Sequence, residues 1–435
     1  MRKFLSWFSN RAAVPATVSP SRTEMLLAAV ESEIDAMDSY HEARAATGPS
    51  VALLPLVPPQ SGAAAGWLGG APRLPKSMPW PEIDGKPALF LAQLDLSHLP
   101  KDVWSGVGPR SGQIAVFVHT HQKKAVVLHL SGELERREGP SPEGSNWLQH
   151  YHDSWPQATA WPEWPVEMVA CEGPDHTPER NADRDAMADR GFIADDALDF
   201  TNPAFWPFDA ETLAQLIAGV RGVLEQREVA ADNTRDKKLS DDTRAAFEAQ
   251  VIELKRARTN FDSLVERLAP HSDSFDFDTV GAELHVLNDM VIPNNSYLRN
   301  EPDGTAVIET RTAKLTDPAK VCGSYWGVQY LAGSTRRARF PYLRDPSLLP
   351  EPVRRRCEGW WAQWATQQYG QMSHAPIGFV YTPHGPGTPN EVLLELPTDD
   401  LIGWIWGDCY SLLLSIPRDN LARGVFDDIM VDITN

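Results

Sequence analysis

The side chains best suited to chemistry in this sequence are carboxylates that follow predicted strands. Asp95 ends one apolar strand, and Asp399 ends a second one near the C-terminus. Asp408 lies in the next turn, beside Trp406, and Gln93 precedes Asp95 within its strand. Carboxylates that converge on one groove would suit acid–base catalysis or cation binding. These five residues are therefore the candidate ligand-binding set, with turn capping as the competing, structural interpretation.

Three histidines form a second candidate site, for a metal ion. His119 and His121 lie two apart on a predicted strand and therefore face the same side. His129 lies on the next strand; it shares their face if the connecting turn has three residues and points away if it has two. Three imidazoles suit zinc or another borderline metal. No second-shell carboxylate is evident nearby in the sequence, so ordinary sheet-face histidines are the competing interpretation.

Motifs of known enzyme classes are missing from the sequence. It contains no Gly-rich phosphate loop, no Gly-x-Ser-x-Gly elbow, no His-Glu-x-x-His and no kinase signature. The turn cluster at 384–389 resembles a phosphate loop only superficially, because its prolines remove backbone donors. No reaction can be assigned from the sequence, and no cofactor is expected.

The elements that position these residues are mostly strands. Apolar runs predict strands at 88–94, 113–121, 125–130, 378–381, 391–396 and 410–416. The segment 89–99 aligns without gaps on 391–401, and each copy is followed by a second apolar strand. This internal similarity predicts a duplicated strand–turn–strand unit and a pseudo-twofold body. A groove at the seam between the copies is where a ligand would be expected.

Helices are expected at two places. A capping box, Ser21 to Glu24, predicts an N-terminal helix, and two amphipathic stripes predict an antiparallel hairpin in which Ser240 caps the second helix. Residues 51–59 suggest a proline-rich connector, and 140–207 a long irregular segment rich in Trp-Pro steps. The resulting α+β organisation is a flexible tail at 1–20, a helix at 21–48, a first half at 50–207, an inserted helical hairpin at 208–270 and a second half at 271–435.

Composition restricts the partners. The 435 residues carry a formal net charge of −19, which opposes binding to nucleic acid and favours a basic protein partner. Two Arg-rich runs, at 336–339 and 354–356, are expected to be solvated faces. Four cysteines without Cys-x-x-Cys spacing suggest buried free thiols in a reducing compartment. No apolar window is long enough to span a membrane, and no signal peptide is recognised, so a cytoplasmic location is expected.

Several of these segments resemble the YwqG-like family of bacterial proteins. The resemblance rests on the motif Gly69-Gly-Ala-Pro-Arg-Leu-Pro with Trp80-Pro81, on Phe90-Leu-Ala-Gln-Leu-Asp-Leu and on Gly112-Gln-Ile-Ala-Val-Phe. Leu393-Leu-Glu-Leu and Trp406-Gly-Asp408 extend it towards the C-terminus. The resemblance implies a duplicated α+β fold in a bacterial, cytoplasmic setting and no established activity. The two copies differ in this motif, because Glu395 stands where the first copy has Gln93.

Two functions are compatible with these observations. The first is a non-catalytic protein-binding module, such as an immunity-like protein that neutralises a basic partner. The acidic charge, the helical hairpin and the lack of catalytic motifs favour it. The second is an enzyme or small-ligand binder that uses the groove between the copies.

Overall fold

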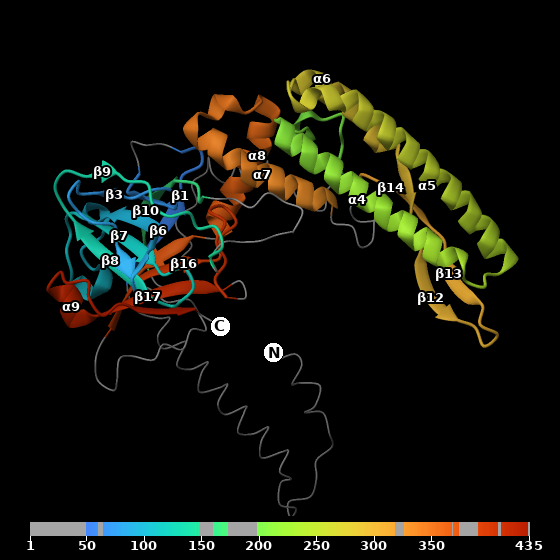
Figure 1. The fold of residues 1–435 in the computed structure, drawn as a ribbon. Coiled ribbons are helices and arrows are strands. Elements are labelled where there is room, and N and C mark those ends of the chain that lie inside the picture. Colours follow the sequence, from blue (N-terminus) through green and yellow to red (C-terminus); the bar gives the residue numbers. More distant parts are fainter. Residues whose placement is uncertain are drawn as a thin grey trace, which may run out of the picture.

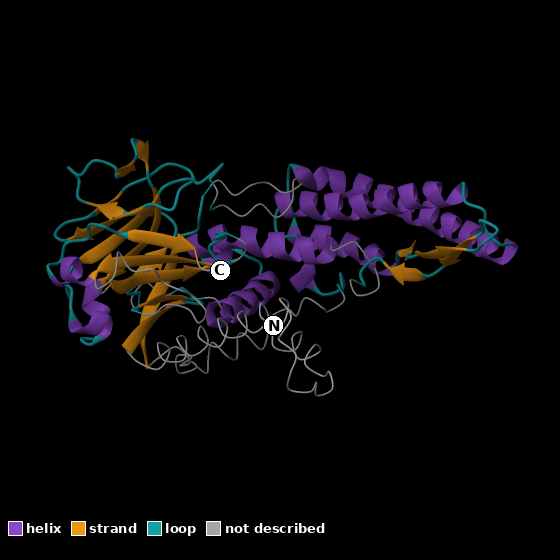
Figure 2. Cartoon of the chain, turned by 90° about the horizontal axis from the view of Figure 1, so that it is seen from below, coloured by secondary structure: helices purple, strands orange, loops and turns teal. Residues whose placement is uncertain are grey.

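The computed structural model describes residues 49–59, 64–145, 147, 160–172, 198–317, 326–367, 369–373, 390–407 and 410–433. The expected tail 1–20, the helix 21–48, the strand 378–381 and Asp408 lie outside these residues. The described chain mixes helix and sheet: a large, nearly closed antiparallel sheet stands at one end, and helices extend away from it (Figures 1 and 2).

The large sheet has ten strands, and every neighbouring pair in it is antiparallel. Lys123, in the loop after β7, forms an ion pair with Asp432 of β18 at 2.7 Å, so that parts near the two edges of the sheet meet. From edge to edge, the strands are β18 (Met430–Ile433), β17 (Ser411–Pro417), β16 (Asn390–Pro397), β15 (Gly370–Met372), β1 (Pro49–Pro55), β10 (Trp164–Glu172), β2 (Gly66–Leu68), β6 (Leu89–Asp95), β7 (Gln113–Val118) and β8 (Ala125–Leu130).

Two strands at the centre of the sheet correct the expectations from sequence. The predicted connector contains β1, and the predicted irregular Trp-Pro segment contains β10; the two pair along all seven residues of β1. Pro49 and Pro55 stand at the ends of β1, and Pro165 is the second residue of β10. A proline at a strand end removes few ladder hydrogen bonds, so these prolines mark strand boundaries rather than loops.

The interior of the sheet is filled by aliphatic and tryptophan side chains. Trp164 lies 5.3 Å from Trp361 of α8 (Glu351–Gln367), ring centroid to ring centroid, in an edge-to-face arrangement. α8 therefore covers this interior. The fully or nearly buried tryptophans of the interior are Trp104, Trp147, Trp161, Trp164, Trp361, Trp404 and Trp406.

The predicted helical hairpin is present as α4 (Ala210–Arg235) and α5 (Asp241–Leu268). Ser240 caps α5, accepting from the N–H of Thr243 at 3.3 Å, as the sequence predicts. Leu216 and Val220 of α4 and Phe261 of α5 belong to a second apolar core. The same core includes residues of α6 (Phe277–Leu284) and of two strands, β11 (Val291–Pro293) and β14 (Thr312–Lys314).

We call residues 209–317 the helical arm. Beyond the second core it carries a short hairpin of β12 (Ser296–Asn300) and β13 (Ala306–Glu309), which lies at the end of the arm farthest from the large sheet (Figure 1). All five residues of β12 are exposed. The distal end of the arm is thus the part of the described chain most remote from the sheet.

Helix α7 (Trp326–Arg344) connects the two cores. Trp326 and Tyr330 near its start lie in the core of the arm, whereas Ala338 and Tyr342 near its end lie in the sheet core. One continuous helix that contributes to both cores couples the arm to the sheet, because neither core can shift without disturbing this helix.

The two Arg-rich runs differ from the expected solvated faces. Arg339 of α7 is only 2% exposed and Arg356 of α8 only 5%. Arg339 donates to the backbone oxygens of Asp400 at 2.9 Å and of Leu401. Arg356 donates to the carbonyl of Ala204 at 2.8 Å. Backbone carbonyls of a turn and of the 3₁₀ helix Pro203–Phe205 thus serve as partners for the two buried guanidinium groups, which charge counting along the sequence does not reveal.

Two further observations concern the cysteines and the length and apolarity of the helices. Cys171 and Cys357 are free and buried, as expected for thiols, while Cys322 and Cys409 lie outside the described residues. Among the described helices, each falls short of the length and apolarity needed to cross a lipid bilayer.

Candidate functional site

The motif Gly69-Gly70 makes a tight turn directly after β2. Gly69 and Gly70 have φ angles of +65° and +70°, which favour glycine. A β-carbon on Gly69 would lie 2.3 Å from the carbonyl oxygen of Pro162, and one on Gly70 would lie 2.3 Å from the β-carbon of Glu163. The turn therefore crosses the start of β10 at a distance that only glycine permits. The chain then continues as β3 (Arg73–Leu74) over the outer face of the sheet.

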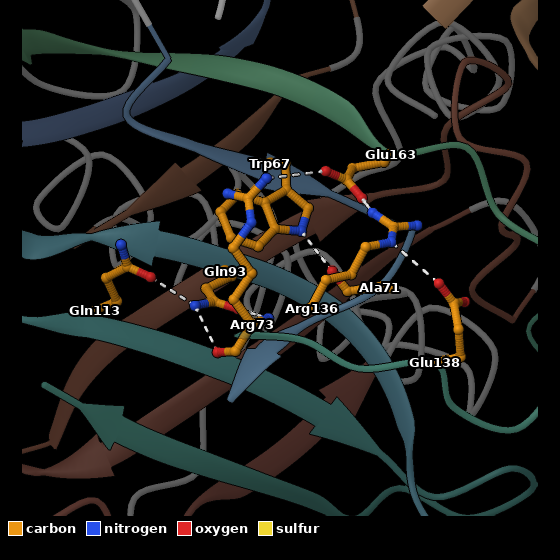
Figure 3. Close-up of polar contacts among 8 residues, drawn as sticks. All are labelled: Trp67, Ala71, Arg73, Gln93, Gln113, Arg136, Glu138 and Glu163. Carbon is orange, nitrogen blue, oxygen red and sulfur yellow. Dashed lines mark hydrogen bonds and ion pairs between the residues drawn. The ribbon is translucent and has the colours of Figure 1, made fainter. Parts of the chain in front are cut away.

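Gln93 of β6 holds this segment in place (Figure 3). Its side-chain oxygen accepts from the Arg73 N–H at 2.8 Å, and its side-chain nitrogen donates to the Arg73 carbonyl at 3.0 Å. The same nitrogen donates to the side-chain oxygen of Gln113 on β7. Gln93 is fully buried. Both polar atoms of its amide are thus hydrogen-bonded within the protein, which makes Gln93 a positioning residue for the motif.

An ion network lies above Gln93 (Figure 3). The guanidinium of Arg73 stacks on the Trp67 ring, 4.2 Å from its centroid, and lies 3.4 Å from the Glu163 carboxylate. Arg136 of β9 (Glu135–Arg136) contacts the other oxygen of Glu163 and pairs with Glu138 at 3.0 Å. β9 pairs with β3, so the backbone brings both guanidinium groups to one carboxylate. Arg136 and Glu163 were missed from the sequence, because nothing local links them.

A cleft of about 180 Å³ adjoins this network. Its lining residues come from both sides of the network; among them are Pro72, Trp80, Glu138 and Trp161. Trp80 is held by a hydrogen bond from its ring N–H to the Ala88 carbonyl at 3.0 Å. The ring N–H of Trp161 is buried and has no hydrogen-bond partner. A buried donor without a partner is costly, so this N–H is available to an acceptor atom of a ligand.

The predicted carboxylates Asp95 and Asp399 do not converge. Five antiparallel pairings separate β6 from β16, so the two strands run in opposite directions. Their C-terminal ends, at Asp95 and shortly before Asp399, therefore lie at opposite ends of the sheet along the strand direction. Asp95 accepts from the N–H of Ser97 at 2.9 Å as the cap of a 3₁₀ turn. Each carboxylate serves its own turn, which corrects the expectation of a shared groove between these two.

Asp399 is buried within its turn. Its carboxylate accepts from the N–H of Leu401 at 2.6 Å. Burial raises the pKa of Asp399 to about 7. The charge of Asp400 also raises this pKa, whereas the hydrogen bond from the Leu401 N–H and the charge of Arg339 lower it. With its carboxylate turned to its own backbone, Asp399 is a structural residue of the turn.

Trp406 belongs to the interior core. It is completely buried, and its ring N–H donates to the carbonyl of Pro397 at 3.1 Å. Its ring centroid lies 5.2 Å from that of Trp147 and 5.5 Å from that of Trp404. A ligand could not reach this ring without disrupting the core, so its contribution is packing. Its neighbour in the candidate set, Asp408, lies outside the described residues.

The three histidines do not gather around one point. His129 lies opposite Ile114 in the ladder, because six residues separate the ends of β7 and β8. It therefore points away from the face of β7 that His119 and His121 were expected to share. Its ring nitrogen lies 2.9 Å from the Ser111 carbonyl. Within the described part of the chain, no group of three or more His, Cys, Asp or Glu side chains is placed to hold a metal ion.

Glu395 of β16 was noted in the sequence only as a departure from Gln93. The structure buries it to 6% exposure. Burial raises its pKa to about 7, and a hydrogen bond with the Ser411 side chain opposes that rise. A carboxyl group that titrates near neutrality inside a sheet makes the stability of that sheet depend on pH.

Comparison with known proteins adds one finding. Residues 67–139 match the model of a domain of unknown function, DUF1963. The match covers the Gly-Gly turn, Gln93 and Arg136, and thus most of the network in Figure 3. No curated protein matches the chain.

Proposed function

We propose that this protein is a non-catalytic protein-binding module whose helical arm contacts the partner. The observation that carries this proposal is a set of large apolar side chains exposed on the arm. Val229 is 60% exposed, Ile252 65%, Tyr297 51% and Leu298 55%. They lie on α4, α5 and β12, and β12 stands at the end of the arm farthest from the sheet (Figure 1). Several large apolar side chains exposed on one projecting part of the chain favour a protein interface there.

The chemistry of the partner follows from charge. The chain carries 59 acidic residues against 40 basic ones, so long-range attraction favours a basic protein. An immunity-like role, in which the protein neutralises a basic partner, is the specific form of the proposal. Free buried thiols support a cytoplasmic location.

A bacterial, YwqG-like origin with internal duplication belongs to the same proposal. The strand order supports the internal duplication, because β8, β7 and β6 stand at one edge of the sheet as β18, β17 and β16 stand at the other. A second support is the register shift in each hairpin, between Phe90 and Ala92 in β6 and between Val392 and Leu394 in β16. These two positions coincide in the gap-free alignment of 89–99 on 391–401.

The experiment places a photo-crosslinking amino acid at Ile252 or at Val425. Val425 is also exposed, at 37%, but lies after α9 (Arg418–Ala422) on the sheet side. We expect a single basic protein to crosslink at 252 and not at 425, and its complex to be lost on gel filtration when Ile252 and Leu298 are both changed to Asp. Crosslinks that are equal at the two positions, or a complex that survives the double substitution, would refute the proposal.

A small-ligand function is the second candidate, favoured by the cleft beside Trp80 and Trp161. Its lining combines aromatic rings with a buried, unpartnered N–H, which suits a ligand with an apolar face and an acceptor atom. An enzyme activity at this cleft is the stronger form of the same alternative. Replacing Trp80 by Ala should abolish ligand binding there; ligand binding that is unaffected by this substitution would exclude the cleft.

A further inference from the structure

A second cleft lies within the helical arm, away from the DUF1963 match. It has a volume of about 270 Å³, close to the lower end for small-molecule sites, and is enclosed by α4, α5, β12, β13 and the end of β11. Apolar side chains, including Phe247 and Val251, form part of its wall. Such a wall accommodates an apolar ligand body.

One buried polar group in this cleft lacks a partner. Gln250 of α5 is 7% exposed, and its side-chain nitrogen donates to the Arg311 carbonyl at 2.8 Å. That hydrogen bond fixes the orientation of the amide, which leaves the side-chain oxygen as the remaining polar atom. This oxygen is buried and has no hydrogen-bond partner. Buried acceptors are normally satisfied, so Gln250 marks a place for the N–H or O–H of a ligand.

The charges of the cleft are of one sign. Arg227 and Lys237 line it, whereas neither Asp nor Glu is found among its described lining residues, in a chain rich in acidic residues. The ammonium of Lys237 lies 4.4 Å from the centroid of the Tyr297 ring, which is also part of the lining. Its neighbour Lys238 instead pairs with Asp303 at 2.8 Å. The ammonium of Lys237 thus gives the cleft a positive charge, which favours a negatively charged ligand.

From this combination we infer that the arm cleft binds a small organic acid. The carboxylate of the ligand lies against Lys237, its N–H or O–H donates to the side-chain oxygen of Gln250, and its apolar body packs on Phe247 and Val251. Of the four exposed apolar side chains of the proposed protein interface, Tyr297 also lines this cleft, whereas the other three are not among its described lining residues. The occupancy of the cleft does not depend on whether a protein partner exists.

The test uses three probes, the N-acetyl derivatives of phenylalanine, leucine and tryptophan, each as the free acid and as the neutral amide. Isothermal titration calorimetry on the full chain should show at least one acid binding about tenfold more tightly than its amide. Lys237→Met should remove this preference and leave amide binding unchanged. Lys238→Met, the matched control, should keep it. Gln250→Met should weaken acid and amide by a similar factor, because both use the same N–H.

The results that would overturn the inference are equally specific. No binding of any of the three acids at about 10 mM would overturn it, as would equal affinity for acid and amide. An equal loss in Lys237→Met and Lys238→Met would also overturn it, since it would indicate a diffuse charge effect. Thermal unfolding by circular dichroism verifies that each variant is folded. If Gln250→Met proves unfolded, the comparison of Lys237→Met with Lys238→Met still decides the outcome.

Discussion

Gln93 of β6 and Glu395 of β16 occupy corresponding positions on two different strands. Each directly follows the β-bulge of its strand. Each hydrogen bonds across to the next strand, Gln93 to Gln113 and Glu395 to Ser411, and in both cases the partner lies two positions before the residue directly opposite. The difference is chemical: an amide remains neutral when buried, whereas a carboxyl group acquires a raised pKa.

The first prediction follows from this difference. The pKa of Glu395 is raised from 4.5 to about 7 in the fold, so between these pH values the folded state binds more protons than the unfolded state. The stability that Glu395 contributes is therefore fully present below about pH 4.5 and is lost as the pH rises through 7. Glu395→Gln should remove this loss and be more stable than the parent by about 3 kcal/mol at pH 8, from 1.36 kcal/mol per pKa unit.

Urea unfolding between pH 5 and pH 8 measures the effect. The curves of the parent and of Glu395→Gln should approach each other at the acid end and separate towards pH 8. Asp95→Asn serves as the control because Asp95 is partly exposed and caps its own turn. Parallel pH profiles for the parent and Glu395→Gln would show that Glu395 does not titrate in this range.

The second prediction concerns the anchoring of the Gly-Gly motif. Gln93→Met leaves the N–H and carbonyl of Arg73 without their side-chain partner, so we expect a loss of about 1–3 kcal/mol in the free energy of unfolding. Gln113→Met removes the contact with Gln93 but keeps both contacts to Arg73, and should cost clearly less. Urea midpoints compare the two; an equal loss would mean that the Arg73 contacts contribute little.

Much of the sheet could be predicted from sequence, for a physical reason. Strands β6, β7, β8, β16 and β17 are apolar runs bounded by turn residues, and all five were predicted. β1 and β10 were missed because their prolines stand at strand ends, where composition resembles a connector. Local sequence records propensity but not the position of a strand within the sheet.

The candidate site could be predicted only in part. Gln93 was selected because it precedes Asp95, yet its role depends on Arg73, twenty residues earlier, which crosses above it. The convergence of Asp95 with Asp399 was wrong, since strand direction follows from the order of all intervening strands. The network of Arg136 with Glu163 likewise joins residues far apart in sequence, and no local pattern contains such information.

The third prediction uses two glycines that differ in their surroundings. A β-carbon at Gly139 would lie 2.2 Å from the Trp80 ring, so Gly139→Ala must displace this ring and should cost about 1–3 kcal/mol. Gly222, within α4, has nothing within 4 Å of its would-be β-carbon. Gly222→Ala should therefore stabilise the protein by about 0.5–1 kcal/mol through helix propensity.

Opposite shifts in the unfolding temperature of these two variants are the expected result. If both Gly139→Ala and Gly222→Ala lowered the unfolding temperature, the close contact at Gly139 would not explain the effect of substituting it.

The fourth prediction concerns the link between α7 and the turn after β16. Arg339 donates to the carbonyls of Arg336, Asp400 and Leu401 and is almost completely buried. Arg339→Met keeps most of the side-chain volume but removes the guanidinium donor from the turn carbonyls of Asp400 and Leu401, so a loss of about 2–4 kcal/mol is expected. Arg344→Met, an exposed position on the same helix, should change stability by less than about 0.5 kcal/mol.

Hydrogen exchange distinguishes this link from a general loss of stability. Because α7 contributes to both cores, Arg339→Met should increase exchange in the turn at 398–406 and in the C-terminal part of α7 more than in α5, which contacts neither. Arg344→Met should leave the exchange pattern of the parent unchanged. If the turn and α5 gained exchange equally, Arg339 would act on global stability alone, and the turn would be held to α7 by its apolar contacts, with Leu401 and Ile402 packed into the sheet core.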